Sequence, residues 1–321
     1  MTFLTKRIPP PYLVGFTAAV VYGVLVRVAI ATHSLGDAVV VMSYAFIVGV
    51  PLVVGYLAVK PHPGPSWLYA IWFPWGPTLA ATVVTMLIGY EGAICIFMAL
   101  PLILVMSSLG GVAAAFVTRR NLARGVTMAV VALPLLMGVV ERELPQPYDV
   151  HQVRNSVDIA APAGLVWREI VSVREIARAE MPGNPLFLRL GFPRPLSAEI
   201  DREEVGGVRR ARFAGGVLFL ETVTALQADS LLSFTIHAET DSIPPKTLDE
   251  HVTIGGPYFD VLRGTYRIEP LGADSVRLHL ESELRVSTHF NWYASAWADL
   301  VMESIQRNIL AVEKTRAEHG R

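Results

Sequence analysis

The sequence predicts an all-α transmembrane helix bundle followed by an α+β domain, in which an antiparallel sheet packs on one long C-terminal helix. Two observations predict this division. Hydrophobic residues make up 52% of the chain, charged residues 17%, and the mean hydropathy is +0.44, which is high for a soluble protein. Of the 27 basic and 28 acidic residues, only 13 lie in residues 1–149. We therefore expect a membrane region at 1–141, a linker at 142–149 and a water-soluble domain at 150–321.

A spanning helix needs about 20 mostly apolar residues, and five segments of the first region approach or exceed that length. The last of them has only 16 residues and is the least secure as a span. Pro74 and Pro77 predict a kink in the third. The predicted spans are Tyr12–Ala31, Ala38–Val59, Trp67–Tyr90, Gly92–Thr118 and Gly125–Val140.

Basic residues alternate from one loop to the next. They are Lys6 and Arg7 before the first span, Lys60 after the second, and Arg119, Arg120 and Arg124 after the fourth. The first and third loops contain no Lys or Arg. Positive charge favours the cytoplasmic side, so we expect a cytoplasmic N-terminus and, after five spans, a periplasmic C-terminal domain in a bacterial inner membrane. If Gly125–Val140 does not cross, the domain is cytoplasmic.

The membrane region is expected to be an anchor rather than a transporter. Arg27 lies near the end of its span, where a long side chain reaches the headgroups, and Glu91 lies in a turn. The sequence indicates no partner for either. Ser107, Gly111 and Ala115 recur every four residues, a spacing that favours close helix packing.

After residue 149 the apolar pattern changes from helical to strand-like. The predicted strands are Val153–Ile159, Leu196–Ile200, Val208–Phe213, Val217–Leu226, Leu231–Glu239, Val261–Glu269 and Val276–Val286. Short helices are expected at Gly164–Val173 and Arg174–Glu180, and a long one at Phe290–Glu318. One face of the last strand carries Val276, Leu278, Leu280, Leu284 and Val286, and the other carries Arg277, His279, Glu281, Glu283 and Arg285. This alternation predicts a sheet covered on one side. The covering stripe of the long helix is expected to be Tyr293, Trp297, Val301, Ile305, Ile309 and Val312.

The order of these elements, and the opening VDIAAPAGLVWREIVSV at residues 157–173, resemble the helix-grip fold of the START-like or SRPBCC family. That family includes polyketide cyclase/dehydrase and lipid transport proteins and the birch pollen allergen. The resemblance covers Val150–Glu318, and membrane spans in front of the domain are not its usual pattern. It implies a curved sheet around the long helix, with an apolar cavity for a hydrophobic molecule. The family has no single catalytic signature.

Candidate site residues follow from the inward faces of the predicted elements. Glu221 stands beside Leu220 in a central strand, where either face is possible, so it is a cavity carboxylate or a solvated one. The cavity candidates are Phe234, Tyr266, Leu278, Leu280, Trp297, Val301 and Glu221. The candidates for the cavity mouth are His251, Tyr258, Asp260, Phe187 and Leu188. The last two belong to an apolar segment rich in Pro and Gly, which we interpret as a lid or as packing over the sheet edge.

We expect a membrane-anchored domain that binds a hydrophobic ligand, a lipid being the preferred class, at the bilayer surface. One alternative is a cyclase- or dehydratase-like enzyme on a membrane-derived substrate, which a buried Glu221, His251 or Asp260 would favour. Another is a sensor or assembly module with a closed cavity. Residues 150–321 have 19 basic and 23 acidic residues, which gives no reason to expect nucleic acid. No metal or cofactor motif is present, and the sequence identifies neither a catalytic residue nor an oligomeric state.

Overall fold

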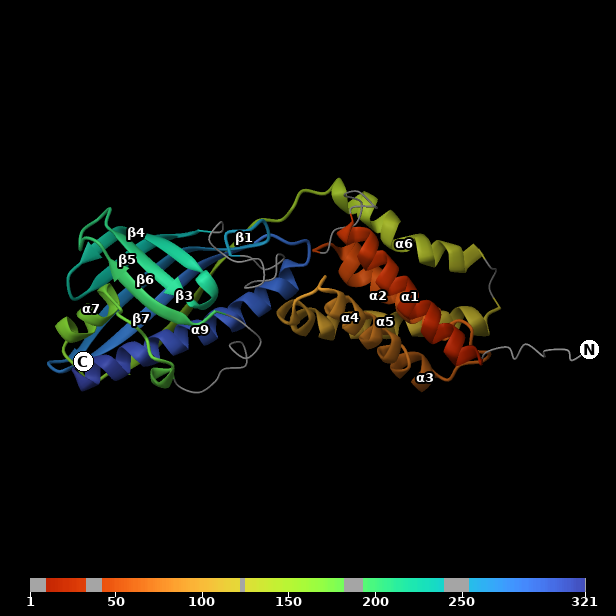
Figure 1. Ribbon diagram of the computed structural model, residues 1–321, viewed down its shortest axis with the longest axis horizontal. Coiled ribbons are helices and arrows are strands. Elements are labelled where there is room, and N and C mark those ends of the chain that lie inside the picture. The colour runs from red at the N-terminus through yellow and green to blue at the C-terminus, as the bar shows by residue number, and fades with distance from the viewer. Residues whose placement is uncertain (1–9, 33–41, 122–124, 182–192, 240–253, 321) are drawn as a thin grey trace, which may run out of the picture. The chain divides into compact units, whose positions relative to one another are not determined.

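The computed structural model describes residues 10–32, 42–121, 125–181, 193–239 and 254–320 (Figure 1). The chain forms two compact units, Met1–Pro145 and Gln146–Arg321. The boundary between them falls inside the predicted linker. Each unit has its own hydrophobic clusters.

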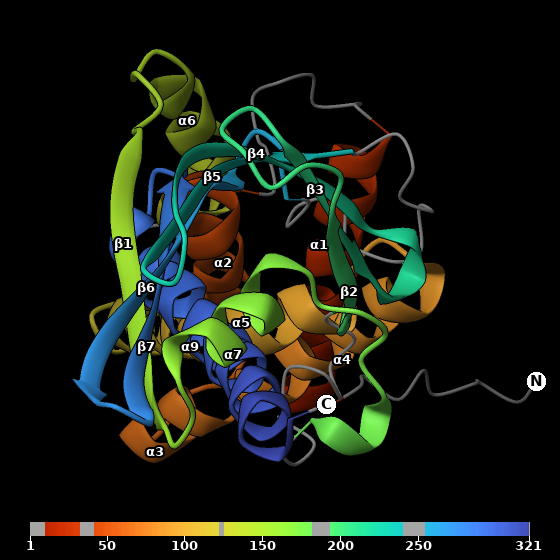
Figure 2. The same cartoon turned by 90° about the vertical axis from the view of Figure 1, so that its left-hand side faces the viewer.

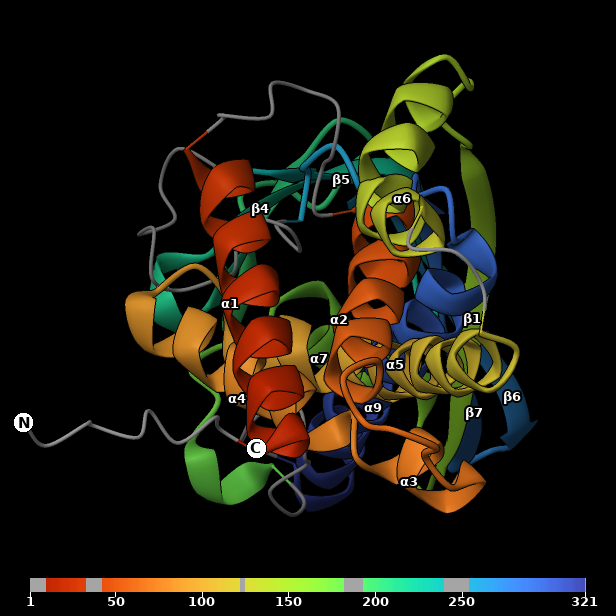
Figure 3. The ribbon, with the colours of Figure 1, turned by 90° about the vertical axis from the view of Figure 1, so that its right-hand side faces the viewer.

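The first unit contains only helices in its described part (Figure 3). The third predicted span divides, as expected, between α3 and α4 near Pro74. The helical elements are α1 (Pro11–Ala31), the π-helical turn η2 (Ala45–Gly49), α2 (Val50–Val59), α3 (Trp67–Trp72), α4 (Trp75–Ile88), α5 (Ala93–Arg119) and α6 (Gly125–Arg142).

Among the described residues, four helical segments are long and apolar enough to cross a membrane, namely α1, α3 with α4, α5 and α6. The prediction that all five segments have spanning length is wrong, because the second is seen only as the shorter apolar helix Ala45–Val59. Residues 38–41 of that predicted span lie outside the described residues. A carboxylate favours a helix N-terminus, and here Glu141 accepts hydrogen bonds from the backbone N–H groups of Tyr44 (2.8 Å) and Ala45 (3.1 Å). This helix therefore starts where α6 ends.

The backbones of α2 and α5 are in contact. A Cβ atom on Gly55 would lie 1.8 Å from the carbonyl oxygen of Ser107, and one on Gly110 would lie 1.9 Å from that of Leu52. The predicted small residues Ser107, Gly111 and Ala115 are all buried. Small side chains let helices approach closely where lipid gives no hydrophobic drive for association.

Arg27 and Glu91 are partners, contrary to the sequence interpretation. The Arg27 Nε atom donates to a Glu91 carboxylate oxygen at 2.5 Å, and its guanidinium also donates to the carbonyl of Tyr90. The side chains are only 4% and 11% exposed. The two residues are 64 positions apart, so only the packing of α1 against the turn between α4 and α5 reveals the pair.

The described part of the second unit contains a seven-stranded antiparallel sheet with the order β1-β7-β6-β5-β4-β3-β2. The sheet curves around α9 (Asn291–His319), with α7 (Ala163–Val171) beside that helix (Figure 2). This is the helix-grip arrangement. The strands are β1 (Asp149–Ile159), β2 (Pro195–Ile200), β3 (Val208–Phe213), β4 (Leu218–Gln227), β5 (Leu231–Ala238), β6 (Phe259–Gly272) and β7 (Ser275–Val286).

The core lies between the concave face of the sheet and the two helices. On β7 every second residue from Val276 to Val286 is buried, as predicted. On α9 the predicted stripe is only partly correct, since Ile305 and Ile309 are half-buried at its flank. The helix buries a wider band that includes Met302, Gln306, Leu310, Glu313 and Ala317. The polar members of that band were not expected at core positions.

The predicted helix Arg174–Glu180 is wrong except for one 3-10 turn, η3 (Arg178–Glu180). The preceding backbone pairs with the start of β2 instead. Val173 and Ala198 exchange two hydrogen bonds of 2.7 Å, and the N–H of Ile176 donates to the carbonyl of Leu196 at 2.7 Å. Long-range pairing overrides the local preference for a helix.

Candidate functional site

Four polar side chains meet inside the core of the helix-grip domain. Arg209 on β3, Glu221 on β4 and Tyr266 on β6 occupy inward positions of the sheet, and Glu313 comes from α9. Their exposed fractions are 3%, 7%, 3% and 1%. Charged residues are almost never buried to this extent unless they are paired. We call these four residues the buried polar cluster.

Arg209 and Glu221 form an ion pair within the cluster. They are direct neighbours in the β3–β4 register, and the guanidinium donates to the carboxylate. Burial opposes the charge on Arg209, but the carboxylate of Glu221 more than offsets it, so the pKa of Arg209 rises. Burial likewise raises the pKa of Glu221, while the guanidinium lowers it. Because a guanidinium stays charged in proteins, the contact is an ion pair.

The guanidinium of Arg209 also lies on aromatic rings. Its central carbon is 5.5 Å from the ring centroid of Phe234 and 6.0 Å from that of Tyr266, within reach of cation–π attraction. Its Nε atom has no acceptor among the described residues. The ring of Phe234 lies across Gly264 on the neighbouring strand, where a Cβ would meet it at 2.6 Å. Glycine at 264 therefore allows Phe234 to cover the ion pair.

The carboxyl of Glu313 makes no hydrogen bond to any described residue. Burial raises the pKa of Glu313 to about 8. The nearby hydroxyl of Tyr266 and the charge of Arg209 lower this pKa, and Glu169 on α7 raises it further. The hydroxyl of Tyr266 is close enough to lower this pKa without the geometry of a hydrogen bond. Glu313 is thus mainly protonated at neutral pH.

Burial and the nearby Glu313 carboxyl raise the pKa of Tyr266 well above its ordinary value, so its phenol is also neutral. The cluster therefore offers an O–H donor and acceptor at Glu313, a phenol, and a free N–H of Arg209, surrounded by apolar side chains. Such groups can hydrogen-bond the polar part of a hydrophobic molecule, or exchange a proton with it. No group of three or more His, Cys, Asp or Glu suited to a metal occurs within the described ranges.

The predicted cavity residues lie around this cluster to different degrees. Phe234, Tyr266, Leu278 and Leu280 belong to one buried hydrophobic cluster. Glu221 points inward and is paired. On α9, Val301 is buried and Trp297 is half-buried, about three turns before Glu313. A ligand-sized space between these residues stays a prediction.

The predicted mouth residues are less informative. Tyr258 and Asp260 are half-buried at the start of β6, and burial raises the pKa of Asp260. Asp260 is six residues from Tyr266 along the strand, about 20 Å, so it does not join the buried polar cluster. His251, Phe187 and Leu188 lie outside the described residues.

Sequence reasoning missed Arg209 and Glu313. Alternation on β3 gives Arg209 the same face as Ala211 and Phe213, which was the available signal. Glu313 follows Leu310 by three residues in a row that starts at Met302. Arg209 is a charged residue in an otherwise apolar row, and the row of Glu313 also contains Gln306. Such positions are easily read as the edge of the polar face.

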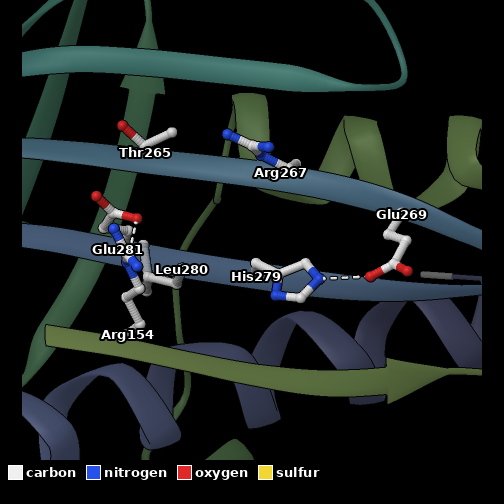
Figure 4. Close-up of a pocket in the computed structure, with 7 residues that line it drawn as sticks. All are labelled: Arg154, Thr265, Arg267, Glu269, His279, Leu280 and Glu281. Atoms are coloured by element: carbon white, nitrogen blue, oxygen red, sulfur yellow. Dashed lines mark hydrogen bonds and ion pairs between the residues drawn. The ribbon is translucent and has the colours of Figure 1, made fainter.

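An open hollow of about 590 Å³ lies on the sheet (Figure 4). Its charged residues occupy positions that alternate with the core. They also pair, because Arg154 contacts Glu281 at 2.6 Å and His279 contacts Glu269 at 2.8 Å. His279 lies on the polar face, as predicted. The lining residues are Arg154, Thr265, Arg267, Glu269, His279, Leu280 and Glu281. Paired, solvated charges make this hollow a weaker candidate than the buried polar cluster.

Comparison with known proteins yields structural likenesses only. No family profile matches the chain, and no curated protein matches it. The Zhui aromatase/cyclase from a Streptomyces species aligns with a TM-score of 0.33 and 17% identity, covering 54% of this chain and 97% of that one. Truncated norcoclaurine synthase from Thalictrum flavum aligns with a TM-score of 0.31 and 16% identity, covering 55% and 98%. At these scores the likenesses carry no argument, and the fold is assigned from the strand order and the long helix.

Proposed function

We propose that this chain is a membrane-anchored protein whose helix-grip domain binds a hydrophobic small molecule, a lipid or lipid-derived compound, in the space between the sheet and α9. The observation that carries the proposal is Glu313, a buried carboxyl without a hydrogen-bond partner in the described part of the chain. Buried polar groups are almost always satisfied, so an exception in an apolar interior needs a partner. A polar group on the ligand would supply it.

The surroundings of Glu313 support this reading. Small-molecule sites are lined mainly by apolar side chains with a few placed polar groups. Here Phe234, Tyr266 and Leu310 belong to the same apolar cluster, and Arg209 adds a second unsatisfied atom. The ligand would thus be mostly apolar, with one oxygen-bearing group facing Glu313 and Arg209.

The proposal is tested by native mass spectrometry of the full chain purified in detergent. We expect a co-purified molecule in the wild-type protein and its loss in Glu313→Leu, which keeps the volume but removes the polar contact. Glu303→Leu on the exposed side of the same helix is the matched control, and it should keep the molecule. A wild-type protein that carries no molecule, and takes up none from bacterial lipid extract, would contradict the proposal.

A second candidate is an enzyme that acts on such a molecule. The observation favouring it is the pKa of about 8 for Glu313, which suits a residue that gives and takes a proton near neutral pH. Glu313→Gln separates the two functions, because the amide keeps hydrogen bonds but cannot donate an acidic proton. If the domain only binds, the variant retains the same molecule as the wild type. If it catalyses, the variant accumulates a different, unconverted molecule.

The membrane topology is part of the proposal. The contact between Arg27 and Glu91 (2.5 Å) brings the end of α1 beside the start of α5. The contact between Lys60 and Thr118 (3.5 Å) brings the end of α2 beside the end of α5. Since α5 has 27 residues, about 40 Å at 1.5 Å per residue, the segment between α1 and Lys60 has to cross the bundle. We infer that α2 crosses although it is short.

The end of α6 lies beside the start of η2, through Glu141. The helix-grip domain would then leave the bundle on the side opposite to the N-terminus. The loop charges make the N-terminal side cytoplasmic. Alkaline phosphatase fused after residue 321 should be active and a fluorescent protein dark in a bacterial host. The reverse result would mean that one helix of the five does not cross.

A further inference from the structure

One end of the helix-grip domain exposes aromatic and aliphatic side chains around the point where the chain enters it. Tyr148 and Trp292 are each 65% exposed, and Val150 is 45% exposed. The side-chain amide of Asn291 donates to the carboxylate of Asp149 at 2.7 Å, which holds the start of α9 against the start of β1. We call the surface formed by Tyr148, Val150 and Trp292 the entry surface.

The connection between the entry surface and the last membrane helix is short. Helix α6 ends at Arg142. The side-chain amide of Gln146 already donates to the carbonyl of Ser287 at 2.6 Å, so only residues 143–145 lie between the end of α6 and the helix-grip domain. Four Cα–Cα steps reach at most about 14 Å. The N–H of Leu144 donates to the carbonyl of Glu141 at 3.0 Å, a turn that shortens this reach.

The side chains of the entry surface have the chemistry of a membrane interface. Trp and Tyr are enriched at the level of the lipid headgroups, where an apolar ring with a polar edge suits the surroundings. The guanidinium of Arg285, which donates to the carbonyl of Gly256, lies 5.9 Å from the ring centroid of Tyr148. In water, by contrast, two large aromatic rings that are two-thirds exposed gain nothing from their exposure.

We propose that the entry surface lies in the headgroup layer of the same bilayer that holds the helices of this chain. The inference rests on the membrane anchoring proposed above. It fixes the domain by two independent restraints, the three-residue connection and the aromatic side chains. The β6–β7 turn, about 36 Å away along β7, then faces water.

For the test, the only cysteine of the sequence, Cys95, is replaced by Ser in the full chain. Single cysteines are introduced as Trp292→Cys and Tyr148→Cys, and each protein is spin-labelled in lipid nanodiscs. Leu271→Cys is the matched control, an exposed apolar residue at the β6–β7 turn (46% exposed). Leu25→Cys, on the exposed side of α1 (61% exposed), reports anchoring. Contact with oxygen is compared with contact with a water-soluble nickel chelate.

We expect labels at 292 and 148 to favour oxygen over the nickel chelate at least several-fold more than the label at 271 does. Equal water contact at 292, 148 and 271 would overturn the docking proposal. So would protection from both reagents, which would indicate a protein partner such as a second copy. If the label at 25 also meets the nickel chelate freely, the anchoring itself fails. This outcome can be distinguished from failure of the docking proposal alone. In that second case the label at 25 faces lipid while the label at 292 faces water.

Discussion

The two units of this chain differ in how completely their buried acidic residues are paired. In the helical unit, Glu91 is held by Arg27 and Glu141 by two backbone N–H groups. In the helix-grip domain, Glu221 is held by Arg209, but Glu313 has no hydrogen bond within the described residues. A carboxylate with a complete set of partners ties elements together. A carboxyl group that is equally buried but lacks hydrogen-bond partners points to a partner that comes from outside the chain.

The units also differ in how they use apolar side chains. The helices expose large residues such as Leu87 (78%) and Leu25 (61%) and meet through small ones. The helix-grip domain buries Leu232, Leu278 and Leu284 completely. A surface of the first kind suits lipid, where close packing rather than exclusion of water holds helices together.

The largest expected effect is on the ion pair. Glu221→Ala leaves the guanidinium of Arg209 buried without a counter-charge, which costs about 3–5 kcal/mol of unfolding free energy. Glu204→Ala removes an exposed partner of Arg202 and should cost less than about 1 kcal/mol. Chemical denaturation followed by the fluorescence of the domain measures both. Equal losses would mean that burial does not distinguish the two pairs.

The next effect is a pH dependence from Glu313. Its pKa is raised in the folded state, to about 8 against an ordinary value of 4.5. The folded protein therefore holds a proton that the unfolded chain releases, and stability from this group is complete below about pH 4.5 and falls until about pH 8. Glu169, Arg209 and Tyr266 face the same carboxyl.

Glu313→Gln removes this difference in bound protons between the folded and unfolded states, because an amide does not titrate. The variant should gain stability over the wild type as pH rises from 4.5 to 8, by up to a few kcal/mol, and the difference should stay constant above pH 8. Thermal denaturation at a series of pH values measures it. A difference that does not change with pH would show that Glu313 has an ordinary pKa.

A smaller effect is expected where α2 meets α5. Gly110→Val places side-chain atoms on the carbonyl of Leu52, and such overpacking typically costs about 1–3 kcal/mol. Gly125→Val is the control, because in the described structure no atom outside its chain neighbours and its own helix backbone lies within 4 Å of a Cβ there. Thermal unfolding of the detergent-purified chain, followed by the helical circular dichroism signal, measures the change. Tolerance of valine at 110 would argue against backbone contact between the two helices.

The smallest effect concerns the charged face of the sheet. Arg154→Gln breaks an ion pair with Glu281 whose arginine is 67% exposed, so the change in unfolding free energy should be below about 1 kcal/mol. The same denaturation assay at low and high salt measures it. A loss as large as that of Glu221→Ala would mean that the hollow in Figure 4 has a structural or binding role.

The division of the chain, the seven described strands and the buried face of β7 could be predicted from the residues alone, because periodicity and charge distribution are local properties. The kink near Pro74 follows in the same way from residues next to one another. The predicted start of α7 and the predicted length of α9 are also close to those observed, since the spacing of apolar residues indicates both.

Which polar residues meet depends on how distant segments of the chain pack together. Arg27 and Glu91 are 64 positions apart, and Tyr266 and Glu313 lie on different elements. Burial of a charged residue depends on what covers it, which alternation on one strand does not reveal. The helix predicted at Arg174–Glu180 failed for the same reason, because pairing with β2 replaced its local hydrogen bonds. The candidate site is a product of register and packing, and these become visible only when the sheet closes around α9.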